Sequence, residues 1–172
     1  GLDSPTKGKI ILDGQVITIL PPYKRDVNMV FQNYALFPHM TAEENIGFGL
    51  RMKGVGREEA AKRTQKLLKL IRLEDLRSRY PSQMSGGQQQ RTSIGRAIVK
   101  NPDILLCDEP TGALDSKAAK ELLKLFTSLN QDGQTILMVT HSVKAASTAG
   151  RVLFIKDGRV FHQIYKGNLS ET

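Results

Sequence analysis

The sequence predicts an α/β fold built around a parallel sheet. Two apolar runs of strand length, residues 104–107 and 136–139, are continuous rather than alternating, as in strands covered on both faces. A helix-like segment separates them, and such alternation of strand and helix is typical of a parallel sheet. With 172 residues, 40% of them hydrophobic, the chain is long enough to bury one core. No apolar run approaches the roughly 20 residues that cross a bilayer, and no leader-like segment is found, so we expect neither a membrane span nor export.

The net charge of +8 raises nucleic acid or an anionic membrane surface as a partner. Residues 51–80 hold ten basic and four acidic side chains, so most of the excess lies in one segment. Aromatic residues make up only 6% of the chain and tryptophan is absent, which leaves little to stack on bases. We therefore expect no nucleic-acid partner. The single cysteine, Cys107, excludes an intramolecular disulfide and is interpreted as a small core residue.

The chain begins with a β-rich part, residues 1–32. Strands are predicted at residues 9–12 and 16–20, joined by a tight turn at Asp13-Gly14. A third strand is predicted at residues 28–31 and ends at Gln32.

Residues 33–84 form a predicted helical part. It opens with a loop, residues 33–40, whose apolar tetrad at 35–38 lies outside any regular element. Thr41 and Glu44 have the spacing of a capping box at the start of a helix. From Arg57 onward, apolar residues recur on one helix face and most basic residues lie on the other.

The third part, residues 85–172, alternates helices and strands. Helices are predicted at 85–100, 116–130 and 143–149, strands at 103–108 and 135–140, and a closing hairpin at 151–156 and 159–164 about Asp157-Gly158. Both predicted parallel strands end in polar residues, and ligands bind at the carboxyl ends of strands in such sheets.

Two adjacent carboxylates, Asp108 and Glu109, follow the first of these strands. Because side chains alternate along a strand, one carboxylate can hold Mg²⁺ while the other orients a water. The alternative is that both only cap the turn into Pro110.

A hydroxyl and two glycines, Ser85-Gly86-Gly87, precede Gln88 at the start of a predicted helix. Exposed N–H groups and the positive end of the helix dipole suit a phosphate at such a site. The same residues also fit an ordinary N-cap. His141 follows an apolar strand, and a lone histidine there is by itself more often structural than catalytic.

Five motifs taken together resemble the ATPase subunits of ATP-binding cassette (ABC) transporters in residue type, order and spacing. On that resemblance the motifs are the Q-loop Gln32, the signature 84–88 with Met84 where Leu is usual, the Walker B Asp108 with Glu109, the D-loop 113–115, and the switch His141. The resemblance extends over nearly the whole chain.

The resemblance implies a P-loop NTPase-like parallel sheet core, with a small antiparallel part at the N-terminus and a helical insertion, hydrolysing ATP with Mg²⁺. It implies catalytic roles for Glu109, His141 and Gln32, nucleotide contacts from Ser85, Gly86, Gly87, Gln88 and Asp115, and metal contacts from Asp108 and Gln32. It also implies a head-to-tail dimer with a second ATPase subunit. Transmembrane permease subunits would contact the tetrad 35–38 and the helical insertion, at the cytoplasmic face of the membrane.

The phosphate loop of this family, G-x-x-x-x-G-K-[ST], does not occur in these 172 residues. The opening residues resemble the segment just after that loop's helix, so we expect residues 1–172 to be a truncated domain. We expect the strand before the loop to lie beside the Walker B strand, its absence to expose apolar sheet edge and face, and the chain alone to bind ATP weakly and to associate.

The subfamily cues differ between the two halves. Residues 21–41 resemble the ATPases of polyamine and sugar importers, whereas residues 108–116 resemble the exporter and lipoprotein-release group. Two alternatives to a transporter motor stay open. One is a soluble ABC-type ATPase that acts on nucleic acid or ribosomes, and the other is a non-enzymatic module that lends its signature helix to a partner.

Overall fold

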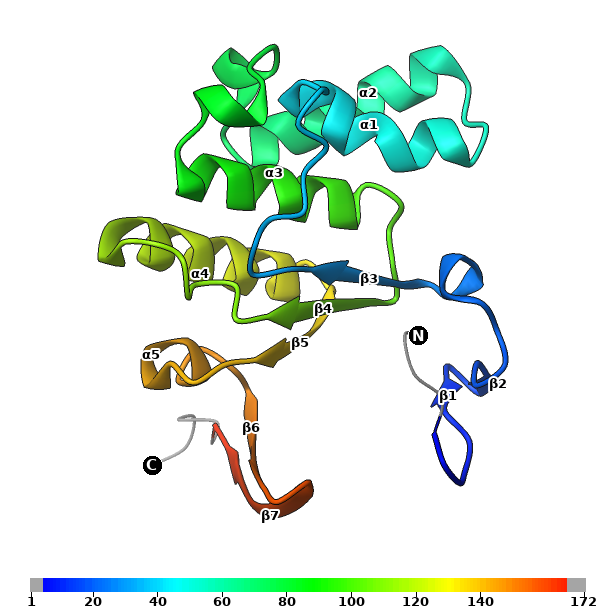
Figure 1. Cartoon of the computed structure of the whole chain (residues 1–172), viewed down its shortest axis with the longest axis vertical. Coiled ribbons are helices and arrows are strands. Elements are labelled where there is room, and N and C mark those ends of the chain that lie inside the picture. The colour runs from blue at the N-terminus through cyan, green and yellow to red at the C-terminus, as the bar shows by residue number, and fades with distance from the viewer. Residues whose placement is uncertain (1–4, 167–172) are drawn as a thin grey trace.

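The computed structural model describes residues 5–166 (Figure 1). Its strands are β1 (Ile11–Leu12), β2 (Gln15–Val16), β3 (Val27–Val30), β4 (Ile104–Asp108), β5 (Thr135–Val139), β6 (Arg151–Lys156) and β7 (Arg159–Tyr165). Its α-helices are α1 (Ala42–Met52), α2 (Arg57–Leu70), α3 (Gly86–Ile98), α4 (Ser116–Gln131) and α5 (Val143–Ala146). Short 3₁₀ turns lie at η1 (Pro22–Lys24), η2 (Glu74–Leu76) and η3 (Pro81–Gln83). None of the helices in residues 5–166 has both the length and the apolar character needed to cross a membrane.

The core sheet is parallel, with the order β3-β4-β5. This confirms the α/β fold with a parallel sheet. In its register Val30 lies opposite Cys107, and Cys107 lies opposite Met138. Since the three strands run in the same direction, the segments after them emerge at one edge of the sheet.

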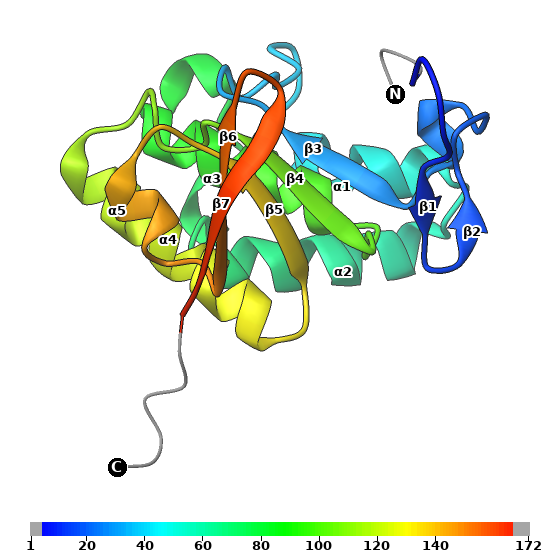
Figure 2. The same ribbon diagram turned by 90° about the horizontal axis from the view of Figure 1, so that it is seen from below.

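The prediction that the sheet is covered on both faces is wrong within the described residues. Helices α1 to α4 all lie behind the sheet when it is viewed from below (Figure 2). Val30, Leu105 and Cys107 point toward them and are buried with residues of α3 and α4. Alternation sends the intervening side chains to the other face, where Leu137 and Val139 are 55% and 61% exposed.

The expectation that a further strand lies beside the Walker B strand is also wrong. That strand is β4, and it is hydrogen-bonded to β3 on one side and to β5 on the other. The free hydrogen-bonding edges of this sheet therefore belong to β3 and β5. The expectation of exposed apolar sheet surface is confirmed, because β5 presents Leu137 and Val139.

Two hairpins flank the core, and their predicted Asp-Gly turns are confirmed. Asp13 and Gly14 have φ values of 45° and 74°, and Asp157 and Gly158 have 49° and 72°, the left-handed pair that tight hairpins require. The first hairpin is shorter than predicted, because residues 17–20 form a turn rather than a strand. Arg25 holds this turn by donating hydrogen bonds to two of its carbonyls.

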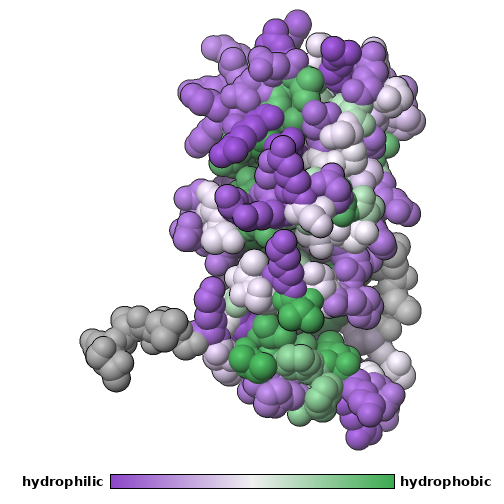
Figure 3. Space-filling view, turned by 90° about the vertical axis from the view of Figure 1, so that its left-hand side faces the viewer, coloured by the Kyte–Doolittle hydropathy of each residue, from purple (hydrophilic) through white to green (hydrophobic). Residues whose placement is uncertain are grey.

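The second hairpin, β6-β7, presents apolar side chains to solvent. Figure 3 shows hydrophobic residues gathered at the lower end of the molecule, where this hairpin lies. Its large exposed apolar residues are Leu153, Phe154, Ile155, Val160, Phe161, Ile164 and Tyr165.

The helical part has its own core. Residues of α1, α2 and the segments after α2 and α3 pack together in it: Ala42, Ile46, Leu50, Ala60, Leu68, Ile71, Leu73, Met84 and Val99. The predicted capping box at α1 is confirmed, since Thr41 Oγ1 accepts from the Glu44 N–H and Glu44 Oε2 accepts from the Thr41 N–H. Within the part of the chain that the structure describes, β3 and the loop after it lead into this region.

Asn45 of α1 fixes the loop between β3 and α1. Its side chain is wholly buried. Its Oδ1 accepts from the Phe37 N–H at 2.9 Å, and its Nδ2 donates to the carbonyls of Phe37, Met40 and Thr41 at 3.0–3.1 Å. One amide therefore satisfies four backbone groups of an irregular segment.

Replacing this amide tests its contribution. Asn45→Leu leaves buried backbone groups without partners, each costing about 1–3 kcal/mol, so we expect the free energy of unfolding in urea to fall by about 2 kcal/mol or more. Asn130→Leu is the matched control on the exposed end of α4 and should change it by less than about 0.5 kcal/mol. Equal effects of the two substitutions would contradict the assignment.

Candidate functional site

The ends of β4 and β5 are joined at Glu109. Its backbone N–H donates to the Val139 carbonyl at 3.0 Å, which continues the pairing of the two strands by one residue. Glu109 itself has φ = 42°, in the left-handed region that a residue with a Cβ rarely adopts. Such backbone strain is concentrated at functional sites.

The Glu109 carboxylate is held by the segment after β5. The Thr140 hydroxyl donates to Oε2 at 3.2 Å, and the His141 backbone N–H donates to Oε1. The His141 Nε2 lies 3.9 Å from Oε1, with its side chain 99% exposed, whereas that of Glu109 is 20% exposed. The structure therefore places the predicted residues Glu109 and His141 in contact.

Gln32 reaches the same site from β3. Its Nε2 lies 3.2 Å from the position that a Cβ on Gly112 would occupy, and the Gly112 N–H donates to the Glu109 carbonyl at 3.0 Å. A side chain at residue 112 would crowd Gln32, so glycine is required here by close approach. Gln32, Glu109 and His141 thus form one group, at the edge of the sheet where Asp108 ends β4.

Gln90 of α3 supports the turn after Glu109. It is wholly buried, and its Nε2 donates to the Pro110 carbonyl at 2.9 Å. Its Oε1 has no hydrogen-bond partner among the described residues. Sequence reasoning missed both Gln90 and Thr140, because these contacts join segments 20 and 31 residues apart and no local pattern marks them.

The signature residues form a second group, at the start of α3. Ser85 and Gln88 make a reciprocal capping box: the Ser85 N–H donates to Gln88 Oε1 at 2.8 Å, and the Gln88 N–H donates to Ser85 Oγ at 3.4 Å. This is the N-cap that the sequence allowed as one of its two interpretations. A Cβ on Gly86 would lie 2.7 Å from the Tyr34 hydroxyl, and one on Gly87 would lie 3.0 Å from the Cβ of Ala118, so both glycines are needed for packing.

Asp115 lies beside this second group as the N-cap of α4. One carboxylate oxygen accepts from the N–H groups of Lys117 and Ala118, both at 2.9 Å. The hydrogen bonds from Ala118 and then Lys117 lower the pKa of Asp115. Gly87 abuts Ala118, so the starts of α3 and α4 lie side by side.

The donor set fits a loosely held magnesium ion. Mg²⁺ takes one or two carboxylates, with waters and phosphate oxygens completing its shell. Asp108 and Gln32 can supply one carboxylate and one amide oxygen. No group of three histidine, cysteine or acidic residues within the described residues could cage a metal by itself.

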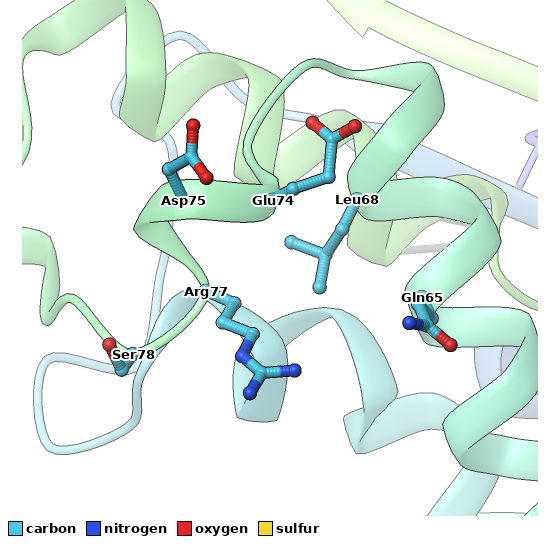
Figure 4. A pocket seen from close by; sticks show the side chains of 6 residues that line it. All are labelled: Gln65, Leu68, Glu74, Asp75, Arg77 and Ser78. Atoms are coloured by element: carbon cyan, nitrogen blue, oxygen red, sulfur yellow. The ribbon is translucent and has the colours of Figure 1, made fainter.

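A separate hollow lies in the helical part between α2 and η2 (Figure 4). It is lined by Gln65, Leu68, Glu74, Asp75, Arg77 and Ser78. The side chains of Glu74 and Arg77 extend away from each other, so its polar groups do not converge as they do in a ligand site. The group around Glu109 is therefore the candidate site.

Comparison with known proteins places these features in one family. Residues 1–112 match the family described as "ABC transporter". The chain is 47% identical, over 93% of its length, to the spermidine/putrescine import ATP-binding protein PotA of Bacillus cereus and 46% identical to the PotA of Oleidesulfovibrio alaskensis. It spans 50% and 43% of those two proteins.

A solved structure is similar over a larger share of its length. The ATP-binding cassette MJ0796, as a dimer in a post-hydrolysis state bound to ADP and Pi, matches with a TM-score of 0.83 and 38% identity. The match covers 96% of this chain and 77% of that one.

The accessibility of Cys107 tests the burial of β4. Burial raises the pKa of its thiol to about 12, and the residue is 2% exposed. Since the thiolate is the reactive form, we expect labelling by a disulfide reagent at pH 8 to be at least about 100-fold slower in the native chain than in guanidinium. Similar rates in the two conditions would show that β4 is not in the core.

The cap at Asp115 predicts a pH-dependent stability. Its folded pKa lies below the unfolded value of about 3.9, so its stabilisation is present above that pH and is lost as the pH falls through the folded pKa. Asp115→Ala should lower the melting temperature at pH 7, with the difference from the parent chain narrowing toward pH 3. Asp115→Asn keeps the cap acceptor without the charge, so its difference from Asp115→Ala should not vary with pH. An unchanged melting temperature for Asp115→Ala at pH 7 would contradict this role.

Proposed function

The chain belongs to the ABC transporter family of ATPases, and from this premise we propose that it forms the ATP-hydrolysing part of a subunit that powers a membrane transporter. The observation that carries the proposal is the Glu109 carboxylate, oriented by Thr140 and His141 at the edge of the sheet that Gln32 also reaches.

We propose that Glu109 orients the attacking water and accepts its proton. Each of its oxygens already accepts one hydrogen bond from the protein, which fixes the carboxylate and leaves a lone pair on each oxygen for the water. The side chain of His141 is exposed and free to contact the γ-phosphate region, and Asp108 and Gln32 would hold Mg²⁺. When bound, this ion offsets the negative charge of the phosphates.

The signature group is the second half of the proposed site. Ser85, Gly86, Gly87, Gln88 and Asp115 would contact a nucleotide held by a second ATPase subunit, in a head-to-tail dimer. The dimeric state of the similar cassette MJ0796 supports this arrangement. We propose three parts for the domain: 1–32 with the Q-loop, 33–84 as the helical subdomain, and 85–172 with the signature, Walker B, D-loop and switch residues.

We propose that permease subunits dock on the loop residues 35–38 at the cytoplasmic face of the membrane, with the basic segment 51–80 facing the same way. Basic side chains are attracted to the anionic lipids of that leaflet. The relatives named as spermidine/putrescine import proteins favour an import system. Since the chain spans about half of their length, its substrate and partners rest on this proposal.

ATP affinity and hydrolysis test the proposal. These 172 residues contain no G-x-x-x-x-G-K-[ST] loop, so we expect no micromolar affinity for a fluorescent ATP analogue in the chain alone. Fusing a strand, phosphate loop and helix from a PotA relative upstream of Gly1 should bring micromolar affinity and ATPase activity. In that fusion, Glu109→Gln should lower the turnover rate at least about 100-fold, whereas Glu58→Gln on the exposed face of α2 should leave it unchanged.

The same assay separates the alternatives. A module that only lends its signature helix would stimulate a second, catalytically complete subunit and would be insensitive to Glu109→Gln. Activity of the fusion that depends on added DNA or ribosomes would favour a soluble ATPase over a transporter motor. Micromolar affinity of the unfused chain for ATP would contradict the proposed dependence on a phosphate loop.

A further inference from the structure

The loop after β3 contains two consecutive residues in the left-handed region. Tyr34 has φ = 59° and Ala35 has φ = 48°, and neither is a glycine. This conformation is unfavourable for residues with a Cβ, so it persists only where surrounding contacts hold it.

Arg96 of α3 makes the contacts that hold these two residues. Its guanidinium donates to the Ala35 carbonyl at 2.7 Å and to the Tyr34 carbonyl at 3.4 Å. Its central carbon also lies 5.3 Å from the centre of the Phe37 ring, within the range of a cation–π contact. One side chain therefore binds both left-handed residues and the aromatic residue of the tetrad.

The loop touches α3 a second time at its N-terminal end. The Tyr34 hydroxyl lies 2.7 Å from the position that a Cβ on Gly86 would occupy, so the phenol rests directly on the first turn of the helix. Tyr34 thus contacts α3 both through its carbonyl, at Arg96, and through its hydroxyl end, at Gly86. A change in the backbone at Tyr34 must move the ring that covers Gly86.

We propose that Arg96 is a positioning residue that locks residues 34–37 onto α3, so that a displacement of Phe37 reaches Gly86 through Tyr34. The inference deepens the proposed function, on which it rests for the role of the loop as the permease contact and of Gly86 as a nucleotide contact. Losing the Arg96 contacts would free the left-handed pair to relax, which would lift Tyr34 from the start of α3.

A single tryptophan makes the lock measurable. The chain has no tryptophan, so Phe37→Trp introduces a unique fluorophore beside Arg96. In that background, Arg96→Leu should raise the acrylamide quenching constant of the tryptophan at least twofold, and Arg96→Lys, which keeps the charge but not the forked donor, should raise it less. Arg91→Leu is the matched control, because Arg91 lies on the same helix and pairs with Glu121 instead; it should leave the quenching unchanged.

Transmission to Gly86 is read from its backbone amide by NMR. Arg96→Leu should shift the Gly86 resonance in the same direction as Tyr34→Leu does, and Arg91→Leu should not shift it. Unchanged quenching in Arg96→Leu would overturn the lock, and a Gly86 resonance that stays in place while quenching rises would overturn the transmission. If Arg96→Leu fails to fold by circular dichroism, Arg96→Lys carries both tests. Neither readout involves ATP or a permease, so these outcomes are independent of the ATPase test of the proposed function.

Discussion

The parallel pairing of β4 with strands on both of its sides is the constraint on which the rest of the structure depends. Because β3, β4 and β5 run in one direction and in one register, the segments after them leave the sheet at the same edge. Gln32, Glu109 and Thr140 each come shortly after one of these strands, so the sheet sets how close their side chains lie. A shift of one residue in β5 would move Thr140 and His141 away from the Glu109 carboxylate and would turn the buried side chains of β5 outward.

Helix α3 connects the site to the remainder of the chain. Its first turn carries the signature group, its middle supports the turn after Glu109 through Gln90, and its last turn holds the loop after β3 through Arg96. The same helix packs on β3 and on α1, so it belongs to both cores. Its position therefore affects the proposed catalytic residues, the nucleotide contacts and the docking loop together.

The sequence predicted the local features well, because a few adjacent residues determine them. The capping boxes at Thr41 and Ser85 and the left-handed Asp-Gly turns depend only on neighbours within about four residues. It predicted wrongly that both faces of the sheet are covered, since an apolar strand does not indicate which elements pack against it. The supports of the site, Thr140 and Gln90, were missed for a related reason: each contact joins distant segments. The roles proposed for Glu109 and His141 came from the order of the motifs, and the structure adds only that the two residues lie together.

Cross-strand nuclear Overhauser effects between backbone protons test the central pairing most directly. We predict that Cys107 of β4 shows contacts to Val30 on one side and to Met138 on the other, and that Glu109 shows contacts to Val139. Contacts from Cys107 to only one neighbouring strand, or to Leu137 or Val139 in place of Met138, would contradict the register and with it the proposed arrangement of Gln32, Glu109 and His141 at one edge.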